Sequence, residues 1–293
     1  MKVLVLLAAG TVALLPSASA QAASVSVDGG VVSIEASRGE TNDLRVTRSG
    51  EELLITDAGA PPSAGSGCQV VDGGVSCAVA GAQALRIELA DGDDRLSLGD
   101  IEMRAEVDGG PGGDSLQGGN GDDMLDGGDG KDVVAGGAGA DKVAGGPGVD
   151  VVSGDAGNDE LSGGAGADAL AGGAGVDTAS YAERRASVAV YLDGKANDGA
   201  KKERDRVGTD VENVLSGSGN DLIYGSEARN MLAGGGGNDT ILGLRGPDRL
   251  DGGDGHDVLV GGPGNDRLSA GAGRDYCNVG PGGGVTRDCE RYG

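Results

Sequence analysis

The sequence predicts an all-β fold, a solenoid of nonapeptide repeats preceded by an N-terminal β segment. Three observations support this prediction: the chain repeats itself every nine residues, glycine recurs at positions 1 and 4 of the repeat, and Val or Leu usually stands at position 8. Glycine permits tight turns, and a single apolar residue per repeat can be buried only against neighbouring repeats. We expect position 8 alone to point inward, since side chains alternate between the two faces of a strand.

Residues 1–20 have the layout of a secretory signal peptide. A positively charged Lys2 precedes an apolar run at residues 3–15, and the small-residue site Ala18-Ser19-Ala20 follows. We expect cleavage after Ala20 or, as the alternative, after Ala22. The apolar run is too short for a retained membrane span, and no other segment approaches twenty apolar residues. The sequence therefore predicts a secreted, extracellular protein without a membrane span.

Residues 21–108 are expected to form the N-terminal β segment. Short runs such as Leu85-Arg86-Ile87 alternate apolar and polar residues, as half-buried strands do. Near the end of the segment, Gly92, Asp94 and Leu96 match positions 4, 6 and 8 of a degenerate repeat. The sequence leaves open whether the segment is a small separate domain or the irregular first coils of the solenoid.

Two blocks of repeats follow. The first, residues 109–180, holds eight copies without a gap, and the second, residues 216–278, holds seven rougher copies. Position 6 is Asp in all copies except one, where it is Asn230. The position-6 aspartates are Asp114, Asp123, Asp132, Asp141, Asp150, Asp159, Asp168, Asp177, Asp221, Asp239, Asp248, Asp257, Asp266 and Asp275.

A connector at residues 181–215 separates the two blocks, and its seven acidic and seven basic residues balance. Residues 188–192 are strand-like, and residues 193–206 form a charged stretch. We expect that stretch to be a solvated loop that bulges from a continuous solenoid.

Four cysteines in an exported chain predict disulfides. Of the three pairings we favour the local one, Cys68–Cys77 and Cys277–Cys289. The first pair flanks a hairpin turn signal at Asp72-Gly73-Gly74, and the second would attach a C-terminal cap, residues 279–293, to the open end of the solenoid. A zinc site is disfavoured because neither pair has the spacing of zinc ligands.

The repeat resembles the nonapeptide G-G-x-G-x-D-x-U-x of the RTX (repeats-in-toxin) or hemolysin-type calcium-binding proteins, among them secreted multi-repeat members. The resemblance implies a right-handed parallel β-roll in which two nonapeptides make one coil. Residues eighteen apart would then stack at roughly 4.8 Å, the usual interstrand spacing. The chain departs from the well-known toxins of the family, which generally carry an uncleaved C-terminal export signal.

Stacked aspartates repel one another unless a cation lies between them. Calcium takes six to eight oxygen ligands at about 2.3–2.6 Å and suits carboxylates together with loop carbonyls. An ion between repeats i and i+2 would give six sites in the first block and five in the second, about eleven Ca²⁺ ions in all. We expect the aspartates to be joined as ligands by the glycines Gly112, Gly121, Gly130, Gly139, Gly148, Gly157, Gly166, Gly237, Gly255 and Gly264.

Composition narrows the function further. A formal net charge of −24 disfavours nucleic acid as a partner. The single histidine, His256, stands at the variable position 5, and neither a two-histidine zinc protease motif, a G-x-S-x-G nucleophile nor an EF-hand loop occurs. We therefore expect a protein that is not an enzyme.

The sequence favours a calcium-binding secreted protein with a structural, surface or matrix role, which is disordered without the ion. The alternative is a calcium-dependent adhesin or partner-binding module, with residues 24–108 or 194–206 as its contact surface. An ice-binding solenoid is disfavoured because Thr178 and Thr240 are isolated. The identity of a cell-surface or extracellular partner stays open.

Overall fold

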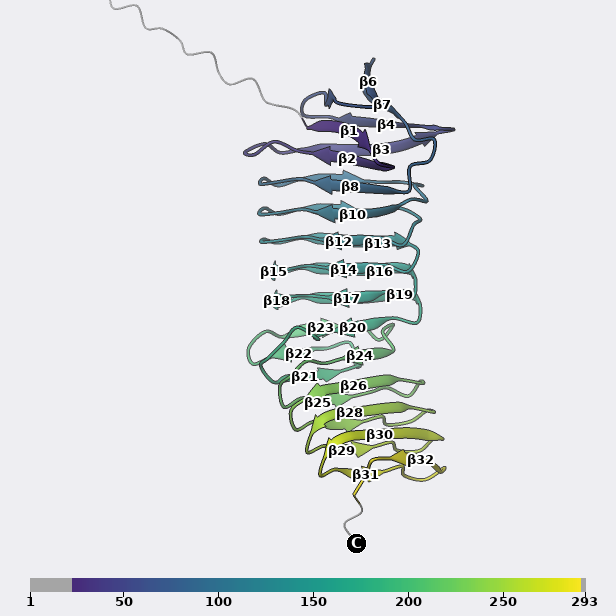
Figure 1. Cartoon of the computed structure of the whole chain (residues 1–293). Helices are drawn as coiled ribbons and strands as arrows, with labels where there is room; N and C mark the ends of the chain where they lie inside the picture. The colour runs from purple at the N-terminus through teal and green to yellow at the C-terminus, as the bar shows by residue number, and fades with distance from the viewer. Residues whose placement is uncertain (1–22, 291–293) are drawn as a thin grey trace, which may run out of the picture.

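The computed structural model describes residues 23–290 of the 293-residue chain, and every regular element in that range is a β-strand. The predicted signal peptide at residues 1–20 lies outside the described residues. The described chain forms a long rod of about 11 stacked turns (Figure 1). Two large sheets form its long faces, one with 14 strands and one with 16.

The 14-stranded sheet receives one strand from nearly every coil. Its strands are β1 (Ser24–Asp28), β2 (Val31–Glu35), β5 (Ser63–Ala64), β8 (Ala84–Glu88), β10 (Arg104–Asp108), β12 (Met124–Asp126), β14 (Lys142–Ala144), β17 (Glu160–Ser162), β20 (Thr178–Ser180), β24 (Asn213–Leu215), β26 (Met231–Gly236), β28 (Arg249–Gly255), β30 (Asp266–Gly273) and β32 (Gly284–Arg287).

The 16-stranded sheet lies on the other side of the core. Its strands are β3 (Asp43–Ser49), β4 (Glu52–Asp57), β6 (Cys68–Val71), β7 (Gly74–Ala78), β9 (Arg95–Ser97), β11 (Ser115–Gln117), β13 (Val133–Ala138), β16 (Val151–Gly157), β19 (Ala169–Gly175), β21 (Val188–Tyr191), β22 (Ala196–Ala200), β23 (Asp205–Val207), β25 (Leu222–Tyr224), β27 (Thr240–Leu242), β29 (Val258–Val260) and β31 (Tyr276–Asn278). A small third sheet pairs β15 (Pro147–Gly148) with β18 (Ala165–Gly166).

The register confirms the expected parallel β-roll. Leu116 pairs with Val134 in parallel, and Val134 pairs with Val152, so each residue faces the one eighteen positions further along. Two nonapeptides therefore make one coil, with one strand in each sheet.

The core is a double column of position-8 side chains. They are almost fully buried along both blocks: Leu116, Leu125, Val134, Val143, Val152, Leu161, Leu170, Ala179, Ile223, Leu232, Ile241, Leu250, Leu259 and Leu268. The expectation that position 8 alone points inward is wrong. The position-6 aspartates are no more than 3 % exposed. Positions 6 and 8 share a face because side chains along an extended chain alternate with a period of two.

Glycine at position 4 allows the coils to approach closely. A Cβ atom on Gly157 would lie 1.5 Å from the carbonyl oxygen of Gly139, and the φ of Gly157 is +151°. The neighbouring coils are joined by hydrogen bonds such as the one from the Gly139 N–H to the Ala156 carbonyl, at 2.9 Å. Any side chain at position 4 would force the coils apart.

The N-terminal segment continues the roll. Strand β2 pairs in parallel with β8, and β3 pairs in parallel with β9, so residues 24–108 form the first coils. Antiparallel pairs (β1 with β2, β3 with β4, β4 with β7, and β6 with β7) cover the end of the roll. Both expected disulfides are present: Cys68–Cys77 joins β6 to β7, and Cys277–Cys289 ties β31 to the C-terminal end.

The connector does not form the expected solvated loop. Residues 196–200 form β22, which runs antiparallel between β21 and β23 inside the 16-stranded sheet. At this level the 16-stranded sheet holds three strands, β21 to β23, where the 14-stranded sheet holds only β24. Because one side of the roll is taller there, the coils below are tilted and displaced relative to those above (Figure 1).

Candidate calcium-binding ladders

The buried aspartates stack into two ladders that follow the two sheets. The first ladder precedes strands of the 16-stranded sheet and contains Asp94, Asp114, Asp132, Asp150, Asp168 and Asp205 above the connector hairpin and Asp221, Asp239, Asp257 and Asp275 below it. The second ladder precedes strands of the 14-stranded sheet and contains Asp123, Asp141, Asp159, Asp177, Glu212, Asn230, Asp248 and Asp266.

One carboxylate oxygen of each aspartate holds the adjacent coil. The Oδ1 atom of Asp141 accepts the Asp123 N–H at 2.8 Å, and the Asp141 N–H is donated in turn to Oδ1 of Asp159 at 2.9 Å. The same bond recurs along both ladders. It fixes the orientation of each carboxylate and leaves its second oxygen, Oδ2, available.

The second oxygens are buried and unpartnered. Among the described residues, thirteen aspartates have a buried Oδ2 atom without a hydrogen-bond donor: Asp94, Asp114, Asp132, Asp141, Asp150, Asp159, Asp168, Asp177, Asp239, Asp248, Asp257, Asp266 and Asp275. A buried carboxylate oxygen without a partner destabilises the folded chain by several kcal/mol, because burial disfavours the bare charge. A cation or a proton that reaches the oxygen removes most of this cost. The ladders are therefore incomplete as purely protein structures.

Glycine at position 1 leaves space beside these oxygens. A Cβ atom on Gly136 would lie 2.4 Å from Oδ2 of Asp141, and one on Gly154 would lie 2.3 Å from Oδ2 of Asp159. Any residue with a side chain would fill that space. Carboxylate oxygens beside bare backbone are the donor set that a hard cation such as Ca²⁺ prefers.

Main-chain carbonyls would have to supply the remaining ligands of such an ion. Within residues 23–290 no group of three or more His, Cys, Asp or Glu side chains gathers at one point. Each ladder step between two acidic residues instead offers two carboxylates, and only the steps that include Asn230 offer one. Gly112, Gly130 and the other position-4 glycines lie in the turns beside them, and a Cβ atom on Gly130 would be 1.4 Å from the Gly112 carbonyl oxygen.

The electrostatics of the ladders show the cost of leaving the carboxylates bare. Burial, opposed by the N–H bonds to Oδ1, raises the pKa of Asp141 and of Asp168 from 3.8 to about 7. Burial likewise raises the pKa of Asp114, Asp239 and Asp248 to about 6. Repulsion from the next carboxylates of the same ladder adds to the rise for Asp141.

The ladders change character in the middle of the roll. Oδ2 of Asp205 accepts the Tyr181 hydroxyl at 3.2 Å, and Oδ2 of Asp221 accepts the Ser216 hydroxyl. Oε2 of Glu212 accepts the Asp177 N–H at 2.9 Å, and the Asn230 side chain bonds to Glu212 O and to Ser226. Here protein groups satisfy the polar atoms.

Two ladder members were missed by the repeat count, Asp205 and Glu212. Each stands two residues before a buried valine, in Asp205-Arg206-Val207 and Glu212-Asn213-Val214, and so keeps the relation between positions 6 and 8. That spacing was the signal that could have identified them. Asp123 was predicted from the repeat and belongs to the second ladder. Its Oδ2 atom accepts the Gly119 N–H at 2.8 Å, so this oxygen, unlike those of most ladder aspartates, already has a donor.

Comparison with known families agrees with this geometry. The RTX calcium-binding nonapeptide repeat matches the chain in four copies, at residues 108–143, 144–179, 215–250 and 251–285. The chain is an RTX-type repeat protein. Its RTX repeats are of the calcium-binding kind. The unmatched stretch between the second and third copies, residues 180–214, contains all but the last residue of the connector. The chain has no match among the curated proteins.

Proposed function

We propose that calcium ions bind between successive coils of this RTX roll, at pairs of ladder aspartates, and that this binding drives folding. The observation that carries the proposal is the series of buried, unpartnered Oδ2 atoms. Nine neighbouring pairs leave both of these oxygens without a donor: Asp94/Asp114, Asp114/Asp132, Asp132/Asp150, Asp150/Asp168, Asp141/Asp159, Asp159/Asp177, Asp239/Asp257, Asp257/Asp275 and Asp248/Asp266.

The proposed nine full sites differ from the eleven expected from the repeats for a physical reason. Asp123 and Asp221 already bond both of their oxygens to protein donors, and Asn230 carries no charge. Three of the eleven expected pairs are therefore lost: Asp123/Asp141, Asp221/Asp239 and Asn230/Asp248. One pair is gained, because Asp94 in the N-terminal segment stacks on Asp114.

Calcium, when bound, supplies the positive charge that offsets the buried carboxylates. The chain supplies the rest. The N–H bonds to Oδ1 hold each carboxylate in place, and position-1 glycines leave room beside Oδ2. One apolar side chain per nonapeptide buries too little surface to offset the entropy of ordering a glycine-rich chain, so the ion contributes directly to folding.

We further propose that the chain is exported and acts as a rigid element at the cell surface or in an extracellular matrix. The two disulfides are compatible with an extracellular location. Nothing helical in residues 23–290 is long and apolar enough to cross a membrane. We propose no catalytic role, since exposed His256 uses its Nδ1 atom to accept the Arg274 N–H of the adjacent coil, a structural contact.

The test is a calcium titration of the mature chain, starting from the chelated form, with far-UV circular dichroism as the readout and magnesium as the parallel control. We expect a cooperative coil-to-β transition at roughly 0.1–1 mM calcium, the range of extracellular modules. Magnesium at the same concentration should leave most of the chain disordered. A chain that is already β-structured in chelator and does not respond to calcium would contradict the proposal.

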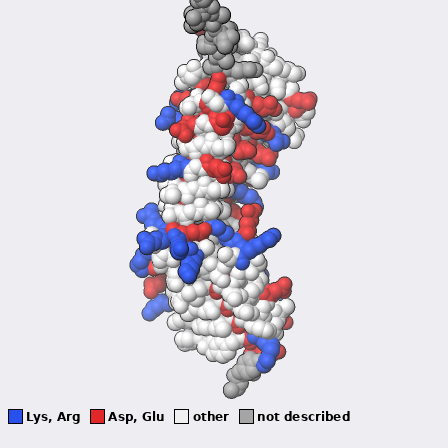
Figure 2. Space-filling model, turned by 90° about the vertical axis from the view of Figure 1, so that its left-hand side faces the viewer, with Lys and Arg blue, Asp and Glu red and all other residues white. Residues whose placement is uncertain are grey.

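A calcium-dependent adhesin is the second candidate. It is favoured by one observation, the exposed basic tip of the β22–β23 hairpin (residues 201–204), which lies at the level where Figure 2 shows Lys and Arg side chains gathered.

A further inference from the structure

The connector separates its charges between the inside and the outside of the roll. Its sequence holds equal numbers of acidic and basic residues, but six of its seven acidic side chains are buried or already bonded to other groups of the protein. Asp198 and Asp205 are buried, and Asp210 accepts the Gly173 N–H. Asp193 pairs with Lys195 at the surface. With Glu203 and Glu212 also engaged, the connector presents a positive surface.

Glu203 is the only acid in the hairpin tip, residues 201–204, and its side chain turns toward the roll. Its Oε2 atom accepts the Ala200 N–H at 2.8 Å, and its Oε1 atom lies 3.2 Å from Nη1 of Arg184. Both side chains of this ion pair are largely buried, with 18 % and 23 % exposed. Glu203 therefore does not neutralise the basic residues beside it.

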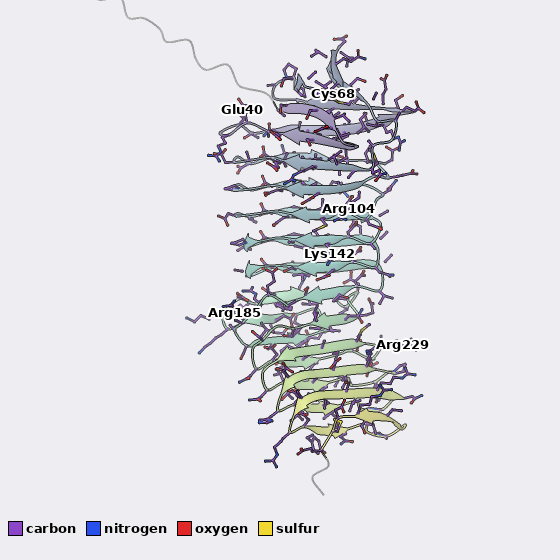
Figure 3. All side chains as sticks on the ribbon, viewed as in Figure 1. Glu40, Cys68, Arg104, Lys142, Arg185 and Arg229 are labelled. Carbon is purple, nitrogen blue, oxygen red and sulfur yellow. A yellow bond between two sulfur atoms is a disulfide. The ribbon has the colours of Figure 1, made fainter. Side chains whose placement is uncertain are left out.

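Lys201, Lys202 and Arg204 are exposed on this tip, and no ion pair engages them among the described residues. Figure 2 shows Lys and Arg side chains gathered halfway along the rod, and Figure 3 shows Arg185 extending into solvent at the same level. Lys202 and Arg204 have positive φ angles, +86° and +70°. Positive φ angles are what the tight turn between β22 and β23 requires, and they fix the direction in which the tip projects.

A hollow of about 410 Å³ lies beside the tip. The three basic residues line one part of it, and the neutral polar side chains Ser187, Asn197 and Asn220 line another. Asp198 also borders the hollow, but its two oxygens accept the N–H groups of Tyr191 and Val207 at 2.6 and 3.0 Å. Ser187 Oγ accepts the Asn220 N–H, Asn220 Oδ1 accepts the Asn238 N–H, and the Asn197 side chain bonds to Asp193. The groups left for a ligand are therefore the three cations together with the remaining donor hydrogens of these side chains.

We propose that this hollow binds an anionic polysaccharide, a sugar chain that carries carboxylate or sulfate groups. Lysine and arginine pair with the anionic groups, and the Asn and Ser side chains suit sugar hydroxyls. The net charge of the whole chain does not prevent this, because charges more than about 8 Å away are largely screened at physiological ionic strength. The site goes beyond calcium ligation and uses no ladder aspartate.

The experiment measures binding of the calcium-loaded mature chain to immobilised heparin, a polyuronate and neutral dextran. The test variant is Lys201→Gln/Lys202→Gln/Arg204→Gln. The control, Arg229→Gln/Arg249→Gln/Arg267→Gln, removes the same charge from exposed positions away from the hollow. We expect binding to one or both anionic polymers but not to dextran, weakened by salt, and roughly tenfold weaker in the test variant only.

Several outcomes would overturn the proposal. Equal loss in both triple variants would indicate nonspecific attraction or calcium bridging, and equal competition by inorganic sulfate would indicate a simple anion site. Salt-sensitive self-association that the test variant abolishes, without polymer binding, would assign the tip to a second copy of the acidic chain. Lys202→Gln alone, with the calcium midpoint of folding as a check, covers the case in which the triple variant folds poorly.

Discussion

Acid should replace calcium in folding the roll. Burial raises the pKa of ladder aspartates above the unfolded value of 3.8, so the folded chain binds protons more tightly than the unfolded chain. Stability from these groups is therefore fully present below the unfolded pKa and is lost as the pH rises through the folded pKa values. The relevant window runs from 3.8 to about 7.

The size of the effect follows from the shifts. The rise from 3.8 to about 7 at Asp141 and at Asp168 corresponds to about 4 kcal/mol each. The rise to about 6 at Asp114, Asp239 and Asp248 corresponds to about 3 kcal/mol each. The total is on the order of 15 kcal/mol, as large as the entire stability of an ordinary domain. Without an ion, the roll should be unstable above neutral pH.

The assay is far-UV circular dichroism of the calcium-free chain, with the ion removed by chelation and desalting before acidification. We expect coil at about pH 8 and reversible gain of β signal as the pH falls toward about 5. Sedimentation at each pH separates folding from precipitation near the isoelectric point of about 4.2.

Asp141→Asn sharpens the test. The amide keeps an oxygen for the Asp123 N–H but removes a buried charge. The variant should fold at a higher pH than the parent without calcium, yet require more calcium at neutral pH. A calcium-free chain that stays disordered throughout the pH window, or an Asp141→Asn chain whose two midpoints do not move in these opposite senses, would refute the reasoning.

Three further predictions concern the packing of the roll. Gly237→Ala should lower the thermal unfolding temperature of the calcium-loaded chain sharply, because its Cβ atom would lie 1.9 Å from the Gly219 carbonyl oxygen at a φ of +110°. The control is Gly236→Ala, whose Cβ atom would have its nearest neighbour 3.8 Å away and which should change this temperature little. Equal effects would contradict the proposed coil contacts. Tyr181→Phe should cost about 1–3 kcal/mol in calcium-loaded denaturant unfolding, since Oδ2 of Asp205 loses its donor; Tyr276→Phe, at a residue 43 % exposed, is the control and should be nearly neutral. Cys277→Ser/Cys289→Ser removes a disulfide between residues 12 apart, which stabilises the folded chain by about 3 kcal/mol. A protease should then remove the C-terminal end before it cuts the repeats. Unchanged protection would show that β32 holds this end by itself.

The repeating part of the structure could be predicted closely, because one period governs turns, strands and core together. The position of Leu116 or Val134 in the core follows from the repeat alone. The inward direction of Asp141 was harder to foresee, since burying a carboxylate is unfavourable unless something compensates for it. The expectation that position 8 alone points inward missed the place of these aspartates inside the roll.

The connector was less predictable for a related reason. Its charged composition indicates a solvated loop, but Asp198 is only 2 % exposed and bonds to strands on both sides of β22. A local reading of charge does not show which acids find main-chain donors. The same limit hid the basic face of the hairpin tip, which arises only when Glu203 turns inward to Arg184.

The protein-satisfied middle of the roll divides a nearly one-dimensional structure. In a stack where each coil contacts only its neighbours, occupancy spreads along the stack through those contacts. At the connector, the Tyr181 hydroxyl and Ser216 hydroxyl take the positions where an ion would couple one coil to the next. If calcium binds as proposed, the connector would weaken the coupling between the two halves, which remain joined through β20 and β24, and we expect the halves to become ordered at different calcium concentrations.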